Sequence, residues 1–167
     1  RKEEHIDRIY EEPEITSAYF KPDLRVLSID IETPMDFKKL FSISLYSKDF
    51  AKALIVSDSE ISGVESFKTE KELLERFKQI VYNYDPDIIT GWNVIDFDLK
   101  IIKERFDENK LEFKFGRIDW PCIIRLNDSF FKESTVDIPG RLVLDAMHLL
   151  KSSFIYLRVY KLQTAAE

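Results

Sequence analysis

The chain has 167 residues, and its 25 lysines and arginines against 31 aspartates and glutamates give a formal net charge of −6. Hydrophobic residues make up 44% of the sequence and charged residues 34%, which is typical of a soluble globular domain and excludes a disordered chain. The acidic excess argues against a surface that grips nucleic acid by bulk positive charge, although it leaves room for a small acidic metal site.

Counts of single residue types exclude several kinds of site. Cys122 is the only cysteine, so neither an internal disulfide nor a cysteine-rich zinc site can form. His5 and His148 are the only histidines, which excludes a multi-histidine metal centre. The sequence contains no apolar run of about 18 residues and its charged start has no signal-peptide core. We therefore expect no contact with a membrane and a cytoplasmic location.

The first part of the chain divides into an arm and three strands. Residues 1–24 are polar and mixed in charge, and we expect them to connect to an upstream domain. The remaining residues, 25–167, are expected to form the domain itself. Within it, residues 25–32, 40–46 and 51–56 have the apolar pattern of strands. Their short connections predict an antiparallel meander.

Helix and strand signals alternate in the middle of the chain. Thr69 and Glu72 form a capping-box pattern that predicts the start of a helix, and Pro86 ends that helix. Residues 87–90 predict a short strand. The following segment predicts a second helix, whose apolar face is made by Ile95, Leu99, Ile102 and Phe106.

The last third of the sequence is less regular. Residues 107–139 are charged, and their pattern does not place any strands. Residues 140–146 predict a strand, and a short helix is expected to follow it as far as Lys151. Together these elements predict an α/β fold, with a mixed sheet of about five strands, the first three antiparallel, flanked by helices.

Two carboxylates in the first strand are the most informative chemical feature. Asp30 and Glu32 are two residues apart, so on a strand both point to one face, while Leu27, Ile29 and Ile31 point to the other. Two like charges beside a core are costly unless a cation neutralises them, and Mg²⁺ or Mn²⁺ prefers carboxylate oxygens. The alternative is a strand end that simply emerges into solvent.

A second acidic segment follows the short strand at Gly91. Asp98 falls in the first turns of a helix, and sites in sheet proteins lie where strand ends meet helix starts. The alternative is ordinary helix capping, with Asn93 as the N-cap and with Asp96 and Asp98 favoured by the helix dipole.

In this order, the two acidic segments resemble the proofreading 3′–5′ exonuclease domain of family B DNA polymerases. The family carries D-x-E on a strand, matched by Asp30 and Glu32, and then N-x-x-x-F-D, matched by Asn93, Phe97 and Asp98. Within the family the sequence is most similar to bacterial DNA polymerase II. The similarity continues through residues 84–102, 140–152 and 160–167.

The resemblance implies a ribonuclease-H-like fold and two-metal hydrolysis of the 3′-terminal phosphodiester bond of DNA. Two Mg²⁺ or Mn²⁺ ions in the complete enzyme would be bridged by Asp30, with Glu32 and Asp98 each binding one. The partners implied are the single-stranded 3′ end of DNA and the polymerase domains of the same chain. The residues implied to contact the DNA strand are Thr33, Asn93 and Phe97.

The third motif of the family, Y-x-x-x-D, has no counterpart after Asp98. Neither Tyr156 nor Tyr160 is followed by an aspartate at the fourth position, and His148 is not followed by one at the fifth. In the family this motif lies further along the chain. We therefore expect a fragment of a polymerase, cut before its third motif at Glu167, that binds metal weakly and has little or no nuclease activity.

Two other functions stay open. The domain could be a non-catalytic ribonuclease-H-like scaffold or interaction domain, or a stand-alone nuclease of the same fold. A complete protein that still lacks a tyrosine–aspartate motif downstream would favour the first, and the length of the complete protein decides the second. Asp145, at the end of the last predicted strand, is interpreted as a structural residue that accepts backbone hydrogen bonds, with metal binding as the alternative.

Overall fold

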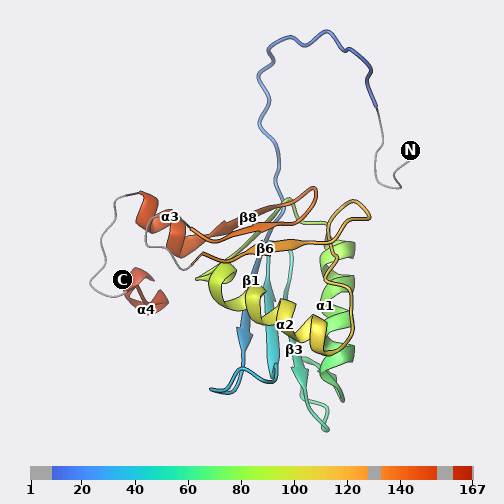
Figure 1. Ribbon diagram of the computed structural model, residues 1–167, viewed down its shortest axis with the longest axis vertical. Coiled ribbons are helices and arrows are strands. Elements are labelled where there is room, and N and C mark those ends of the chain that lie inside the picture. The colour runs from blue at the N-terminus through green and yellow to red at the C-terminus, as the bar shows by residue number, and fades with distance from the viewer. Residues whose placement is uncertain (1–8, 128–132, 154–159, 167) are drawn as a thin grey trace.

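The computed structural model describes residues 9–127, 133–153 and 160–166, and its centre is a six-stranded mixed sheet (Figure 1). The strands of this sheet lie in the order β4-β3-β2-β1-β5-β8. They are β1 (Val26–Glu32), β2 (Ser42–Tyr46), β3 (Ala51–Val56), β4 (Glu65–Phe67), β5 (Ile88–Gly91) and β8 (Leu142–Asp145). A separate sheet pairs β6 (Ile123–Arg125) with β7 (Thr135–Asp137).

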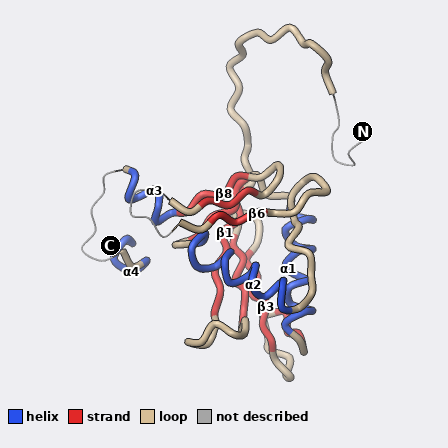
Figure 2. Tube along the Cα trace, viewed as in Figure 1, coloured by secondary structure: helices blue, strands red, loops and turns tan. Residues whose placement is uncertain are grey.

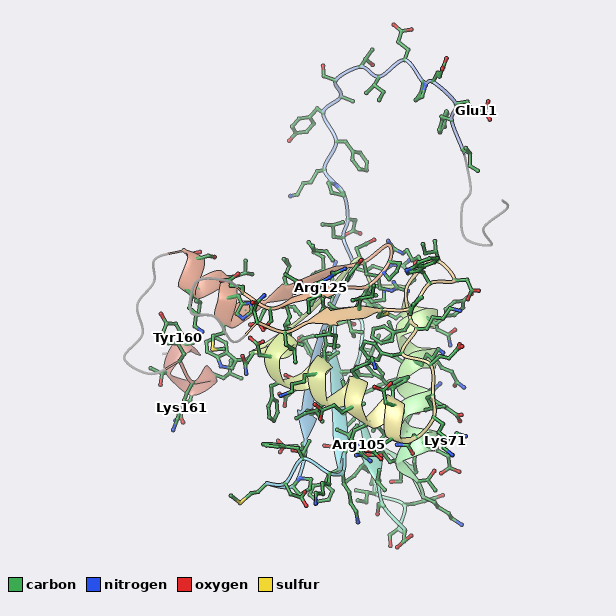
Figure 3. All side chains as sticks on the ribbon, in the orientation of Figure 1. Glu11, Lys71, Arg105, Arg125, Tyr160 and Lys161 are labelled. Carbon is green, nitrogen blue, oxygen red and sulfur yellow. The ribbon has the colours of Figure 1, made fainter. Side chains whose placement is uncertain are left out.

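The first helix follows four strands, and the later helices follow β5 and β8. The helices are α1 (Glu70–Tyr84), the π-helix η1 (Val94–Leu99), α2 (Lys100–Glu108), α3 (Ala146–Ser152) and α4 (Leu162–Ala166). None of the helices in the described residues has the length and apolar character needed to cross a membrane. Before β1, residues 9–25 form neither helix nor strand, and they lead away from the sheet as a long loop (Figure 2). Side chains on this loop, including Glu11, project away from the rest of the domain (Figure 3).

The predicted antiparallel meander is confirmed. β1 pairs with β2 and β2 with β3 in antiparallel register, whereas β5 and β8 extend the sheet in parallel on the other side of β1. The α/β fold with a mixed sheet is therefore confirmed. The sheet has one strand more than the five expected, because β4 adds to β3 in parallel. β4 has three residues, all half-buried, so it has no alternating pattern for sequence analysis to detect.

One face of β1 faces the core and the other faces outward. Leu27, Ile29 and Ile31 are buried, whereas Asp30 and Glu32 are exposed on the opposite face, as the alternation predicts. The core is completed by apolar side chains of the helices, and burial of this apolar surface is the main force that stabilises the fold. The buried helix residues in α1 and α2 are Leu73, Leu74, Phe77, Ile80, Val81, Ile101, Ile102 and Phe106.

Helix α1 begins and ends where local signals predict. Thr69 and Glu72 form the complete capping box, in which each side chain accepts a hydrogen bond from the backbone N–H of the other residue. The helix ends at Asp85, which is left-handed with φ 52°, immediately before Pro86. The first helical residue, Glu70, has a further role described below.

Two arginines, Arg117 and Arg141, bond to the acidic turn just before β5 and fix residues 115–117, part of the segment 107–139 that the pattern could not place. Arg117 donates to the carboxylates of Asp85 and Asp87, both at 2.8 Å. Arg141, which is almost completely buried, donates to Asp85 at 2.7 Å and also to the Phe115 carbonyl oxygen at 3.1 Å. These bonds tie the irregular segment to the turn between α1 and β5.

Glu70 joins three separate parts of the domain. Its carboxylate accepts hydrogen bonds from the Leu40 N–H at 2.7 Å, from the Arg105 guanidinium at 2.8 and 2.9 Å, and from Asn109 at 2.6 Å. Burial opposes ionisation of this group, but the hydrogen bonds from Arg105, Asn109 and Leu40 outweigh burial and lower the Glu70 pKa. Glu70 therefore anchors α1 to α2 and to the loop before β2. Arg105 is labelled on α2 in Figure 3.

Replacement of Glu70 by glutamine is expected to destabilise the fold at neutral pH by about 1–3 kcal/mol, because the partly buried Arg105 loses its charged partner and one acceptor oxygen becomes an NH₂ donor. The lowered pKa of Glu70 means that its ionised form contributes stability above the ordinary pKa, and that this contribution is lost as the pH falls through the folded value. The difference between the two proteins should therefore shrink in acid. Urea denaturation at pH 7 and pH 3 measures it.

Glu75→Gln is the matched control, because Glu75 is exposed on the same helix. A Glu70→Gln protein as stable as the Glu75→Gln protein at pH 7 would contradict the anchoring role.

Candidate active site

The end of β1 runs past its neighbour β5. Residues 26–28 of β1 pair in parallel with residues 88–90 of β5, so Ile31 lies beyond the paired stretch. The side chain of Asp98 takes the place of the missing strand there, because its Oδ1 accepts a hydrogen bond from the Ile31 N–H at 3.0 Å. Asp98 thus reaches β1 between Asp30 and Glu32.

A glycine at the end of β5 allows this close approach. A Cβ added at Gly91 would lie 2.6 Å from the Ile29 carbonyl oxygen and 3.0 Å from the Val94 Cβ. Asn93 then turns the chain in the left-handed conformation, with φ 59°, which asparagine tolerates better than most residues. Asn93 occupies the N-cap position of η1, as the capping interpretation expects, but its side chain makes no capping hydrogen bond.

The helix that carries Asp98 opens with a π-helical segment. A π-helix has a wider turn than an α-helix, with bonds from residue i to residue i+5. Val94 and Ile95 are buried in its first turn, and Asp98 and Leu99 are buried four residues further on. The sequence predicts an ordinary helix start, which is wrong over η1. The predicted apolar face is confirmed, since all four of its residues are buried, and short π-helical segments are frequent at functional sites.

No basic side chain of the described residues compensates the charge of Asp98. Asp98 is 1% exposed, and burial together with the negative charge of Asp30 raises its pKa to about 7. Burial and the charge of Glu32 also raise the pKa of Asp30. In the described part of the chain no lysine or arginine forms an ion pair with Asp30 or Asp98. A cation supplied from outside the protein would favour their ionised forms.

The donor chemistry of these residues fits a hard divalent cation. Asp30, Glu32 and Asp98 offer only carboxylate oxygens, the donors that Mg²⁺ and Mn²⁺ prefer. Among the residues that the structure describes, however, no three Asp, Glu, His or Cys side chains are grouped so that they could hold one ion. The structure brings Asp98 to the strand of the other two carboxylates, and the convergence of all three on metal stays a prediction.

Asp145 is buried beside the first turn of η1. Its Oδ2 accepts a hydrogen bond from the Ile95 N–H at 3.1 Å, and its Oδ1 accepts from the N–H groups of Met147 at 2.9 Å and His148 at 3.3 Å. The interpretation of Asp145 as an acceptor of backbone hydrogen bonds is confirmed. His148 also reaches η1, since its Nε2 lies 3.1 Å from the Asp96 carboxylate, a contact between residues 52 positions apart that sequence analysis missed.

The loop after β1 contributes an aromatic residue that sequence analysis also missed. Phe37 is 47% exposed, and its ring meets the ring of Phe97 edge to face, with the centroids 5.7 Å apart. Phe97 is half-buried and precedes Asp98. Lys38 and Lys39, both exposed, follow Phe37. An apolar residue beside two lysines in a loop is the signal that could have identified this position.

The residues that the sequence assigns to DNA binding all lie near the end of β1. Phe97 lies within η1 and Asn93 directly precedes it. Thr33 directly follows β1, where its Oγ1 donates to the Pro34 carbonyl oxygen at 3.1 Å. This geometry does not test a contact with DNA, so the three assignments stay predictions.

The sheet and the helices that follow it define an α/β domain of ribonuclease-H-like architecture. Residues 3–165 match the family model for the exonuclease domain of DNA polymerase family B. DNA polymerase II of Escherichia coli (strain K12) is 30% identical over 158 residues, which cover 89% of this chain and 20% of that protein. A DNA polymerase of Desulfurococcus sp. (strain Tok) is 30% identical over 152 residues, with 87% of this chain and 19% of that protein covered.

The chain therefore belongs to the exonuclease domains of family B DNA polymerases. Domains of this family are 3′–5′ exonucleases that generally depend on metal and act on DNA within the polymerase chain. The resemblance to this family that the sequence motifs indicate is confirmed. The chain spans about a fifth of the length of the curated relatives it matches.

The raised pKa of Asp98 predicts a stability that depends on pH. Between the ordinary pKa of 3.8 and the folded value of about 7, the folded chain holds a proton that the unfolded chain releases, so stability falls as the pH rises through this range. Asp98→Asn cannot ionise and still has an oxygen that can accept from Ile31. In metal-free buffer at pH 8 it is expected to be more stable than the natural sequence by about 2–4 kcal/mol.

Urea denaturation with EDTA at pH 8 and at pH 4 measures this difference, which should nearly disappear in acid. Asp58→Asn is the control, because Asp58 is exposed in the loop after β3. Equal stabilities of Asp98→Asn and the natural sequence at pH 8 would show that ionised Asp98 does not destabilise the fold.

Proposed function

We propose that this chain is the proofreading exonuclease part of a family B DNA polymerase and hydrolyses the 3′-terminal phosphodiester bond of DNA. The single observation that carries the proposal is the hydrogen bond from the Ile31 N–H to Asp98, which brings a third carboxylate to the strand of Asp30 and Glu32. Membership of the family supports the same activity.

In this proposal the ions are Mg²⁺ or Mn²⁺, two in the complete enzyme. Asp30 would be shared by both ions, and Glu32 and Asp98 would each hold one. When bound, the ions would supply the Lewis acidity that hydrolysis of a phosphodiester needs, toward the attacking water and the leaving 3′-oxygen. The protein contributes fixed positions for the carboxylates: Asp30 and Glu32 project from one face of a central strand, and Asp98 is buried and hydrogen-bonded to that strand. A fixed, partly dry site strengthens the attraction between these charges and a cation.

The terminal nucleotides of a single DNA strand are the proposed substrate. The Phe37 ring contacts the ring of Phe97, the residue that precedes Asp98 in the chain, and exposed aromatic rings such as Phe37 can stack on DNA bases of any sequence. Lys38 and Lys39 would supply positive charge for the phosphates. Thr33 and Asn93 complete the proposed contacts with the strand.

Residues 99–167 contain no Y-x-x-x-D motif, so this chain supplies three of the carboxylates and no tyrosine that could orient the water. We therefore propose that the 167-residue chain by itself binds metal weakly and has little nuclease activity. The polymerase activity, and a role in replication or repair, belong to the complete protein and are proposed for it alone.

The metal site is tested by Mn²⁺ titration of the natural sequence and of Asp30→Ala, followed by electron paramagnetic resonance of the free ion. We expect weak binding by the natural sequence and loss of detectable binding in Asp30→Ala, because the bridging carboxylate is gone. Asp58→Ala, which removes an exposed acid, controls for the loss of net charge. If Asp30→Ala binds as Asp58→Ala does, the site assignment fails and the scaffold alternative gains support.

The same three proteins are incubated with a 5′-labelled single-stranded oligonucleotide and Mg²⁺. Little degradation is expected from any of them. Rapid degradation by the natural sequence that Asp30→Ala abolishes would contradict the low activity while supporting the assignment of Asp30.

The aromatic contact predicts a separate effect on DNA binding. Phe37→Ala should weaken binding of a single-stranded oligonucleotide by about 1–3 kcal/mol, the usual value for loss of one base–aromatic stack. Fluorescence anisotropy with EDTA present measures this without cleavage. Phe41→Ala is the matched control, because Phe41 lies in the same loop and is 48% exposed. Equal losses in the two variants would show that the Phe37–Phe97 pair has no special role.

A further inference from the structure

The carboxylate of Asp145 divides its two oxygens between two elements. Oδ1 accepts from the first N–H groups of α3, whereas Oδ2 accepts from the Ile95 N–H in the first turn of η1. Asp145 is 3% exposed, so little water is available to replace any of these bonds. The residue is thus more than a helix cap: it links the end of β8 to the helix that carries Asp98.

Only a carboxylate meets both demands at this position. Serine is as good an N-cap as aspartate, but its single oxygen cannot also reach a second element. Asparagine has the right shape and one acceptor, so its NH₂ group must face one of the two sets of N–H donors. The two-sided acceptor explains why aspartate stands at position 145 better than capping alone does.

The opposite end of η1 is fixed to a different strand. Ile95 is bonded to Asp145, and three residues later Asp98 is bonded to the Ile31 N–H on β1. β8 itself is held in place beside β5, because Gly91 pairs with Asp145 and the Thr90 hydroxyl donates to the Leu144 carbonyl oxygen at 2.7 Å. The π-helical segment is therefore anchored at both ends by single carboxylates.

We propose that Asp145 is a positioning residue that holds the first turn of η1 against β8, so that Asp98 stays bonded to β1 and is aimed at the metal site. That Asp145 preserves the hydrogen bonds of the Ile95 and Ile31 amides is a purely structural claim. Its consequence for metal binding rests on the proposed function of Asp98.

The test uses Asp145→Ser, which keeps an N-cap for α3 and removes the acceptor for Ile95. Amide hydrogen exchange by NMR reports each bond separately. In Asp145→Ser we expect the Ile95 and Ile31 amides to exchange about five- to tenfold faster, the effect of losing one hydrogen bond, while the His148 amide stays protected. Thr69→Ala is the matched control, because it removes the cap of α1, which has no bond to η1.

Asp145→Asn is the second variant, in case the serine protein does not fold. Here either the Ile95 amide or the α3 amides must lose protection, because one oxygen cannot serve both. Unchanged protection of Ile95 and Ile31 in Asp145→Ser, relative to Thr69→Ala, would overturn the positioning role. In Asp145→Asn, full protection of both the Ile95 amide and the α3 amides would overturn it.

Mn²⁺ affinity provides the functional readout. Loss of a residue that supports a metal ligand typically weakens binding by about 10- to 100-fold, so the Mn²⁺ dissociation constant of Asp145→Ser should rise about tenfold while that of Thr69→Ala does not. If Asp30→Ala abolishes binding and Asp145→Ser leaves it unchanged, the positioning role is overturned and the proposed function stands. If Asp30→Ala leaves binding unchanged, the proposed function fails, and the exchange of the Ile31 amide still decides the structural claim.

Discussion

The hydrogen bond between the Ile31 N–H and the Asp98 carboxylate is the interaction on which the site depends. A strand that extends past its parallel neighbour has N–H groups without partners, and a buried N–H without a partner is costly. Here the acceptor for the Ile31 N–H is the side chain of Asp98 on η1, where a neighbouring strand would otherwise supply a carbonyl oxygen. The same bond places the buried carboxylate of Asp98 next to Asp30. The two negative charges repel each other, and a nearby cation would relieve this repulsion.

The local geometry around this bond follows from a short run of residues. Gly91 lets the chain pass close to Ile29, and Asn93 reverses it in a left-handed conformation. The π-helical segment then turns Asp98 inward together with Leu99, so that one residue serves the site while its neighbour fills the core. Each of these features departs from regular structure, and all of them fall within one connection between strand and helix.

The sequence predicts what depends on neighbouring residues and misses what depends on distant ones. Alternation in β1 correctly separates Asp30 and Glu32 from the core, and the Thr69 capping box correctly starts α1. The π-helical segment has the same apolar spacing as an ordinary helix, so its wider turn leaves no local trace. The bonds that Asp145 and His148 make to η1 join residues about fifty positions apart, which no pattern in a single sequence contains.

The acidic residues at the two ends of β5 differ in whether a basic side chain pairs with them. Before the strand, Asp85 and Asp87 lie beside Arg117 and Arg141, and their hydrogen bonds keep the pKa of both acids low even though burial acts against this at Asp85. After the strand, Asp98 faces Asp30, no basic side chain in the described residues pairs with them, and the pKa values of both acids are raised. Asp85 and Asp87 are thus paired with arginine, whereas Asp30 and Asp98 have no basic partner among the described residues. A divalent cation bound at that strand end, as we propose, would compensate Asp30 and Asp98 and would let an acidic chain act on an acidic polymer.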